Sequence, residues 1–128
     1  MAVWILAALG LFVVQTFLPS TARALSGDSV QKRFLKGNRD VAPDPTVMVG
    51  RMQRALTNMI EALIVFLPLA VLAQAQGTDA TTGAAIFVLA RIAYVPAYAV
   101  GIPLLRSAIW TVGHVGLGMM VWAVWPVG

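Results

Sequence analysis

An apolar segment from Gly50 to Ala73 carries four polar side chains in its first half: Arg51, Arg54, Asn58 and Glu61. Their offsets of 0, 3, 7 and 10 place all four within roughly 80° of one another on a helix. Charged groups inside a membrane helix are costly to insert and by default mark a functional site that faces the bundle interior. Arginine binds carboxylates in fork geometry, glutamate binds a cation, and asparagine both donates and accepts. The stripe therefore favours a pocket for an anionic ligand that also carries an amine.

A second polar stripe lies farther along the chain at Arg91, Tyr94 and Tyr98, whose offsets of 0, 3 and 7 again define one helix face. A Gly-Ile-Pro turn follows, and Arg106 and Ser107 begin the next apolar segment. If the two stripes run antiparallel in one bundle, all these groups converge at the same depth. The lipid side of such a pocket would admit an apolar co-substrate.

A purely structural role for these groups stays open. Arg54 and Glu61 lie two turns apart on one helix, too far for the usual i, i+4 pair, so each needs another partner. An ion pair between Arg91 and Glu61 would join two helices without binding a ligand. The two tyrosines alone are typical of helix interfaces, and the single histidine, His114, is typical of a packed side chain.

The composition indicates an integral membrane protein. Of the 128 residues, 59% are hydrophobic and only 11% are charged, and the mean hydropathy is +0.83. The net charge of +4 would suggest nucleic-acid binding in a soluble protein, but here the basic residues cluster in one loop and membrane topology accounts for them. The absence of cysteine excludes disulfides, a thiolate nucleophile from the chain itself and cysteine metal sites. We expect neither a bound metal nor a nucleic-acid partner.

The apolar runs predict an all-α, four-helix membrane bundle formed as one domain by residues 1–128, with spans at about 2–22, 50–73, 84–100 and 104–125. The polar loop 23–49 contains a short amphipathic stretch, 29–36, that suits an interfacial helix. Either Thr46 or Gly50 is expected to cap the second span. Pro19 is expected to bend or end the first helix, and Pro68 is expected to kink the second. A cleaved signal peptide is the alternative for 2–22, although no basic region precedes its apolar run.

Charge placement predicts the orientation in the membrane. The loop 23–49 and the turn 103–106 carry the lysines and arginines, whereas the connector 74–83 and both termini carry none. The positive-inside rule therefore places the long loop in the cytoplasm and both termini outside. Trp4, Trp122 and Trp125 then lie together at the outer interface, as an aromatic belt requires. Three glycines of the last span, Gly113, Gly116 and Gly118, would allow a neighbouring helix to approach closely.

The motifs resemble those of a known family. The second span reads RxxRAxxNxxEA from Arg51 to Ala62, followed by FLPL from Phe66 to Leu69. This run resembles the second-helix signature of the MAPEG family, the membrane-associated proteins of eicosanoid and glutathione metabolism. The run from Ala90 to Ser107, ARxxYxxxYxxGIPxxRS, resembles the third helix and the following turn of that family. The loop 37–40, GNRD, is most similar to the bacterial branch.

The resemblance implies a left-handed four-helix bundle that forms a homotrimer in a bacterial inner membrane, with glutathione as co-substrate between subunits near the cytoplasmic face. By position, it implies glutathione-binding roles for Arg54, Asn58, Glu61, Tyr94 and Tyr98. Arg51 and Arg91 lie on the same two stripes and are expected to take part in binding. Arg106, with Ser107 beside it, matches the place where family members stabilise the thiolate. Arg23 matches a first-helix arginine that reaches glutathione from a neighbouring subunit.

Two functions follow from this reading. The first is a glutathione-dependent transferase or peroxidase that acts on lipophilic electrophiles. The second, since the family includes members without demonstrated catalysis, is a non-catalytic accessory subunit of a larger membrane complex. A small transporter has little support, because the four spans show neither inverted repeats nor broken helices.

Overall fold

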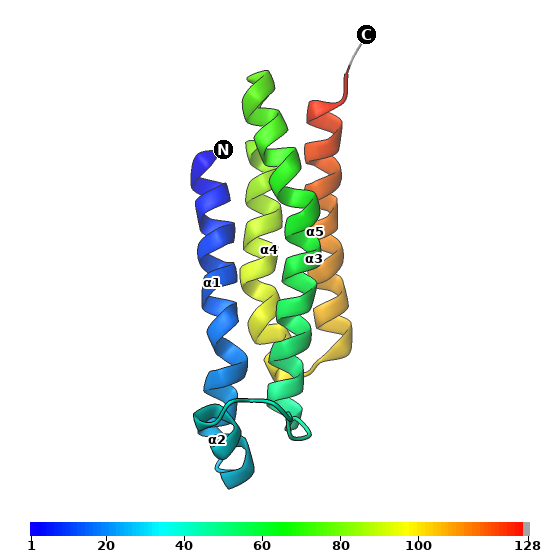
Figure 1. Ribbon diagram of the computed structural model, residues 1–128. Coiled ribbons are helices and arrows are strands. Elements are labelled where there is room, and N and C mark those ends of the chain that lie inside the picture. Colours follow the sequence, from blue (N-terminus) through cyan, green and yellow to red (C-terminus); the bar gives the residue numbers. More distant parts are fainter. Residues whose placement is uncertain (127–128) are drawn as a thin grey trace.

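The computed structural model describes residues 1–126, and within this range it contains five helices and no strand. The helices are α1 (Ala2–Leu25), α2 (Ser29–Lys36), α3 (Val47–Gln76), α4 (Thr81–Val100) and α5 (Pro103–Val124). The four long helices lie side by side along one axis, and α2 lies at the foot of α1 (Figure 1). The N-terminus and the end of α5 lie at one end of the bundle, opposite α2 and the α4–α5 turn.

All four long helices are long and apolar enough to cross a membrane. α1 has 24 residues, so it rises by about 36 Å and exceeds the roughly 30 Å of the hydrocarbon core. The helices begin or end up to three residues away from the boundaries expected from the sequence, and α3 gains a turn at its start because Thr46 caps it. The Oγ1 atom of Thr46 accepts a hydrogen bond from Val49 N at 3.3 Å, which selects Thr46 over Gly50 as the cap.

The prolines within the spans do not end their helices. α1 continues through Pro19 to Leu25, and α3 continues through Pro68 to Gln76. α3 and α4 instead end at glycines in the left-handed conformation, Gly77 with φ 66° and Gly101 with φ 80°.

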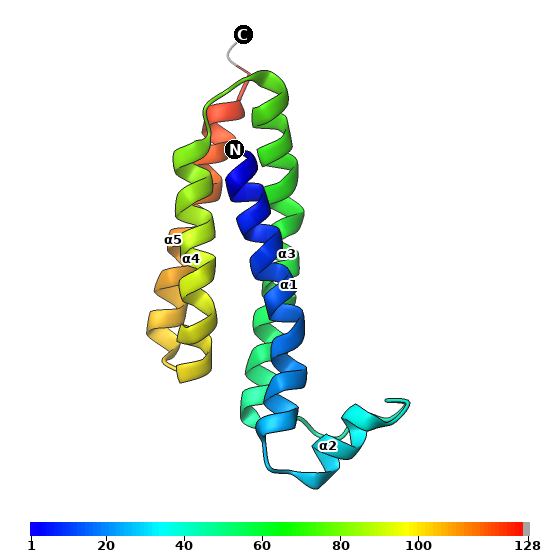
Figure 2. The same cartoon turned by 90° about the vertical axis from the view of Figure 1, so that its left-hand side faces the viewer.

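The bundle consists of two helix pairs, α1 with α3 and α4 with α5, and the apolar core lies between them. At its centre Phe66 of α3 stacks on Phe87 of α4, with ring centroids 4.6 Å apart. Figure 2 shows the two pairs diverging toward the end that carries α2 and the α4–α5 turn.

Of the three glycines expected to admit a neighbouring helix, Gly116 does so within the chain. A Cβ atom on Gly116 would lie 2.7 Å from Gly83 O and 2.8 Å from Phe87 N, so α4 and α5 touch backbone to backbone here. Gly113 has ordinary spacing to Ala90, at 3.5 Å, and Gly118 has no atom within 4 Å. The close contact of α4 and α5 therefore rests on the Gly83–Gly116 pair.

Candidate functional site

Three adjoining cavities line the α3–α4–α5 face, from the end of the bundle nearest α2 to beyond its middle. The inner cavity, of about 240 Å³, includes Arg51, Arg54, Tyr98 and Arg106. The middle cavity, of about 470 Å³, shares Tyr98 and Arg106 with it and adds Asn58, Tyr94, Ser107, Trp110 and Thr111. The outer cavity, of about 250 Å³, shares Asn58 and Trp110 with the middle one and adds Glu61, Arg91, His114 and apolar side chains. We call this connected series the polar groove.

Tyr98 organises the inner end of the polar groove. Arg54 Nε donates a hydrogen bond to Tyr98 Oη at 3.0 Å, and the guanidinium carbon of Arg54 lies 5.8 Å from the ring centroid. The guanidinium of Arg106, from the first turn of α5, lies 4.9 Å from the same centroid. Two cations from different helices are thus held beside one aromatic ring, in range for cation–π attraction. Like charges so close together favour an anion between them.

Arg51 has a structural partner at the same end. Its Nη1 donates to Ala99 O at 2.9 Å, and its guanidinium fills the space beside Gly101 where any larger residue would carry a Cβ. Arg51 therefore satisfies a carbonyl left open at the C-terminus of α4. A ligand that bound Arg51 would compete with this cap.

Arg91 and Asn58 meet in the middle of the groove. Arg91 Nη1 donates to Asn58 Oδ1 at 2.5 Å. Arg91 is only 2% exposed, and its Nε and Nη2 atoms have no hydrogen-bond partner among residues 1–126. The rings of Phe87 and Tyr94 lie 5.4 and 5.3 Å from the guanidinium carbon and partly compensate its charge. Arg91 thus remains an incompletely neutralised buried cation.

The sequence left open a contact between Arg91 and Glu61 that would join two helices. The structure shows no hydrogen bond between them: Nη1, the Arg91 nitrogen that has a partner, donates to Asn58. Glu61 is exposed and lines the outer cavity with Arg91. Its carboxylate is therefore accessible to a ligand.

Beyond Arg106 and Ser107, α5 adds three side chains to the groove that were not expected from the sequence: Trp110, Thr111 and His114. His114 Nδ1 lies 2.9 Å from Trp110 O, and the His114 and Trp110 rings are 3.7 Å apart. If Nδ1 carries the proton, it donates to this carbonyl and Nε2 is left as an acceptor. A signal did exist: Ser107, Trp110, Thr111 and His114 have offsets of 0, 3, 4 and 7, one face of a helix.

Arg23 lies apart from the polar groove. It is 5% exposed, donates to Gln31 Oε1 and lies 4.8 Å from the ring centroid of Phe34. Gln31 Nε2 in turn donates to Asp44 O at 2.7 Å. Within this chain Arg23 therefore joins α1 to α2 and the following loop. A ligand role for Arg23 would require exchange of its bond to Gln31.

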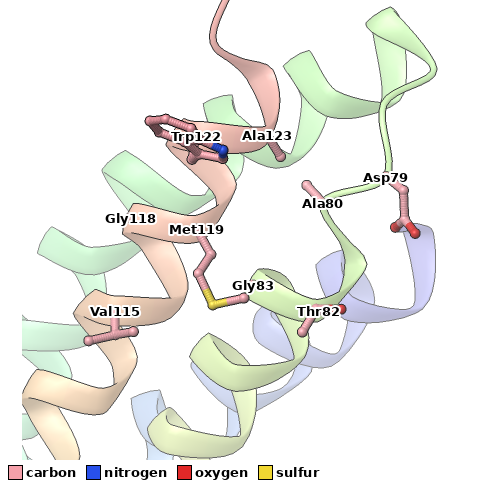
Figure 3. A pocket seen from close by; sticks show the side chains of 9 residues that line it. All are labelled: Asp79, Ala80, Thr82, Gly83, Val115, Gly118, Met119, Trp122 and Ala123. Atoms are coloured by element: carbon pink, nitrogen blue, oxygen red, sulfur yellow. The ribbon is translucent and has the colours of Figure 1, made fainter.

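A separate cavity of about 640 Å³ lies at the opposite end of the bundle, between the start of α4 and the end of α5 (Figure 3). Its walls are mainly apolar, including Met119 and Trp122, and Asp79 is the charged residue among those that line it. The backbone N–H of Thr81 donates to Asp79 Oδ1 at 2.9 Å, and this bond holds the pKa of Asp79 below its usual value. This cavity lacks the converging cations and tyrosines of the polar groove.

The fold and the groove define a helical integral membrane protein with a polar site between three of its long helices. The chain belongs to the MAPEG family, whose family model matches residues 1–125. This match confirms the resemblance seen in the motifs and indicates a glutathione-related membrane function. No curated protein and no solved structure matches the chain. Within residues 1–126, no group of three or more histidine, aspartate or glutamate side chains is arranged to hold a metal ion.

Proposed function

We propose that the protein is a glutathione-dependent transferase or peroxidase that acts on lipophilic electrophiles. The observation that carries the proposal is the polar groove itself. Side chains from three membrane helices bring arginines, tyrosines, an asparagine and a glutamate to one connected site. Such groups are expensive to place within a membrane and are kept there by function.

The residues present fit glutathione, which carries two carboxylates, an ammonium group, two amides and a thiol. Arg54 and Arg106, both beside Tyr98, suit a carboxylate or thiolate. Arg91 contributes a buried positive charge with unpartnered N–H groups, which makes an anionic ligand favourable. Glu61, exposed in the outer cavity, suits the ammonium group. A ligand of mixed charge therefore matches the groove better than a simple anion.

Bound glutathione would supply the sulfur nucleophile that the chain lacks, because it has no cysteine. An ordinary thiol titrates near pH 8.5, so only a few per cent is ionised at pH 7. The guanidinium of Arg106 would stabilise the thiolate, and each unit by which the thiol pKa falls corresponds to about 1.4 kcal/mol. Ser107 adds a hydroxyl donor in the same cavity. The role of Tyr98 is to keep Arg106 and Arg54 at the inner end.

The outer cavity offers space for the second substrate. Its apolar walls include Val65, Leu117 and Val121, next to the aromatic ring of Trp110. This part of the groove opens on the membrane-facing surface of α5, where many side chains are exposed. An apolar electrophile dissolved in the bilayer would therefore approach without crossing water.

The proposal includes the assembly and orientation expected from the sequence: a left-handed homotrimer in a bacterial inner membrane, with glutathione between subunits near the cytoplasmic face and both termini outside. Exposed apolar residues support burial by lipid or a second subunit, among them Leu6 at 68% and Ile64 at 68%. Gly118, with no atom within 4 Å, leaves room for a close neighbour.

Isothermal titration calorimetry with glutathione tests the proposal on the detergent-purified protein. We expect saturable binding in the wild type that weakens at least about tenfold in Arg54→Ala and Glu61→Ala, since each loses a charge-assisted contact. Lys36→Ala is the matched control, because Lys36 is an exposed cation on α2 outside the groove. Absence of binding in the wild type would refute the proposal. Co-purification with other membrane proteins at fixed stoichiometry would then favour the accessory-subunit alternative.

A further inference from the structure

A cavity on the flank of α2 is unrelated to the polar groove. It has a volume of about 480 Å³ and is formed by one side of α2 and the loop 37–43. Two arginines, Arg33 and Arg39, share it with the apolar side chains of Val30, Phe34 and Val41. Cations beside exposed apolar surface are a combination suited to an amphiphile rather than to a soluble ion.

The position of α2 places this cavity at the depth of lipid headgroups. α1, at about 36 Å, spans the roughly 30 Å hydrocarbon core with a few ångströms to spare. Only residues 26–28 separate the end of α1 from the start of α2. Figure 2 shows α2 extending sideways from the foot of the bundle rather than continuing along its axis. The helix therefore lies along the membrane surface.

The apolar wall of the cavity is open in the isolated chain. Val30 is 54% exposed and Val41 is 85% exposed. Exposed valines beside arginines at the level of the headgroups are stabilised when glycerol and acyl carbon atoms cover them. Phe34 is partly held in place from the other side by Arg23, whose guanidinium lies 4.8 Å from its ring centroid.

The backbone of Arg39 is constrained in a way that helps to form the cavity. Its φ of 62° is the only positive φ of a non-glycine residue in the described chain, and such a conformation costs free energy that its surroundings must offset. It folds the loop back so that Arg39 Nη2 reaches Leu35 O at 3.4 Å. Arg33 and Arg39 thereby line the same cavity from helix and loop.

We propose that this cavity binds an anionic phospholipid of the surrounding membrane, with the phosphodiester held by Arg33 and Arg39 and the upper acyl chains against Val30 and Val41. The charged residues that line the cavity are these two arginines and Asp40, so its net charge is +1. This charge complements a headgroup of net charge −1, such as phosphatidylglycerol, better than it complements a zwitterionic headgroup. The site is independent of glutathione binding.

Lipid retention measures this binding directly. The full-length protein is reconstituted in an equimolar mixture of phosphatidylcholine and phosphatidylglycerol, extracted gently in detergent, and its retained lipid is measured by mass spectrometry. We expect phosphatidylglycerol to be enriched by up to about twenty-five-fold, from a factor of about five for each of two basic residues near an anionic lipid. Arg33→Gln with Arg39→Gln should lower the retained ratio to that of the mixture.

The matched control is Lys32→Gln with Lys36→Gln, which removes the same total charge from positions on α2 whose side chains lie outside the cavity. This control should keep the enrichment. The proposal is overturned if both double variants lose enrichment equally, since the effect is then diffuse surface charge. It is also overturned if the wild type retains both lipids at the mixing ratio. Circular dichroism confirms that the exposed substitutions leave the helices intact.

Discussion

Replacing Asn58 by alanine removes the acceptor that the guanidinium of Arg91 has among residues 1–126. The bond from Arg91 Nη1 to Asn58 Oδ1 is 2.5 Å long, and the other two nitrogens of the guanidinium have no partner in the described chain. Arg91 is 2% exposed, so water cannot readily take the place of Asn58. We therefore expect Asn58→Ala to destabilise the bundle.

The magnitude follows from the charge of the donor. Interhelical hydrogen bonds in membrane proteins contribute about 0.6 kcal/mol on average, whereas hydrogen bonds to charged groups contribute about 1.5–3 kcal/mol. The burial of Arg91 places its bond to Asn58 in the second range. We expect a coupling free energy of about 2 kcal/mol, or about thirtyfold in the unfolding equilibrium.

A double-mutant cycle measures this coupling. Asn58→Ala, Arg91→Met and the double variant are unfolded reversibly in mixed detergent micelles and followed by circular dichroism. Thr57→Ala is the control, because Thr57 is exposed and its hydroxyl bonds only within α3, to Gln53 O at 3.1 Å. A coupling energy at or below about 0.6 kcal/mol would show that Arg91 behaves like an ordinary neutral donor and would refute the reasoning.

Three further predictions concern packing, chemistry and pH. Gly116→Ala should destabilise the fold by about 1–3 kcal/mol in the same unfolding assay, because its Cβ would overlap the α4 backbone. Gly118→Ala, with no atom within 4 Å of its Cβ, should be neutral or stabilising. Equal effects of the two substitutions would contradict the close contact of α4 and α5 at Gly116. Arg106→Gln should lower glutathione turnover at pH 7 by about tenfold and move the pH–rate profile about one unit upward, as expected if Arg106 lowers the thiol pKa by one unit; a uniform loss at every pH would argue against thiolate stabilisation. Because the pKa of Asp79 is lowered in the folded protein, its bond to Thr81 stabilises the start of α4 at pH values above about 4, the pKa of Asp79 in the unfolded chain. This stabilisation is lost as the pH falls through the folded pKa. Hydrogen exchange at the Thr81 amide, corrected for its intrinsic rate, should show this loss in the wild type and not in Asp79→Asn.

The sequence predicted well those features that depend on periodicity alone. The four apolar spans and the polar faces of α3 and α4 follow from hydropathy and from the 3.6-residue helical repeat. The groove also brings Arg54, Asn58 and Tyr98 together, as expected from their spacing on two antiparallel helices. Their role in binding glutathione stays a prediction.

Features that depend on particular long-range partners were not predictable in this way. Arg51 and Arg54 share a helix face, yet Arg51 is drawn to the open carbonyl of Ala99 while Arg54 turns to Tyr98. Arg23 is taken up by Gln31, eight residues later, because α2 folds back on the end of α1. Such choices depend on where other helices end, and no local pattern records that.

The α4–α5 turn has a mechanical consequence. Only Gly101 and Ile102 separate the two helices, and the guanidinium of Arg51 occupies the space beside Gly101. The turn has little freedom to hinge, so the α4–α5 hairpin should open and close as one cooperative unit in hydrogen exchange. The backbone positions from which Tyr98 and Arg106 project are then fixed relative to each other. The backbone entropy of arranging these helix ends is lost when the chain folds, so a ligand has only side chains left to order.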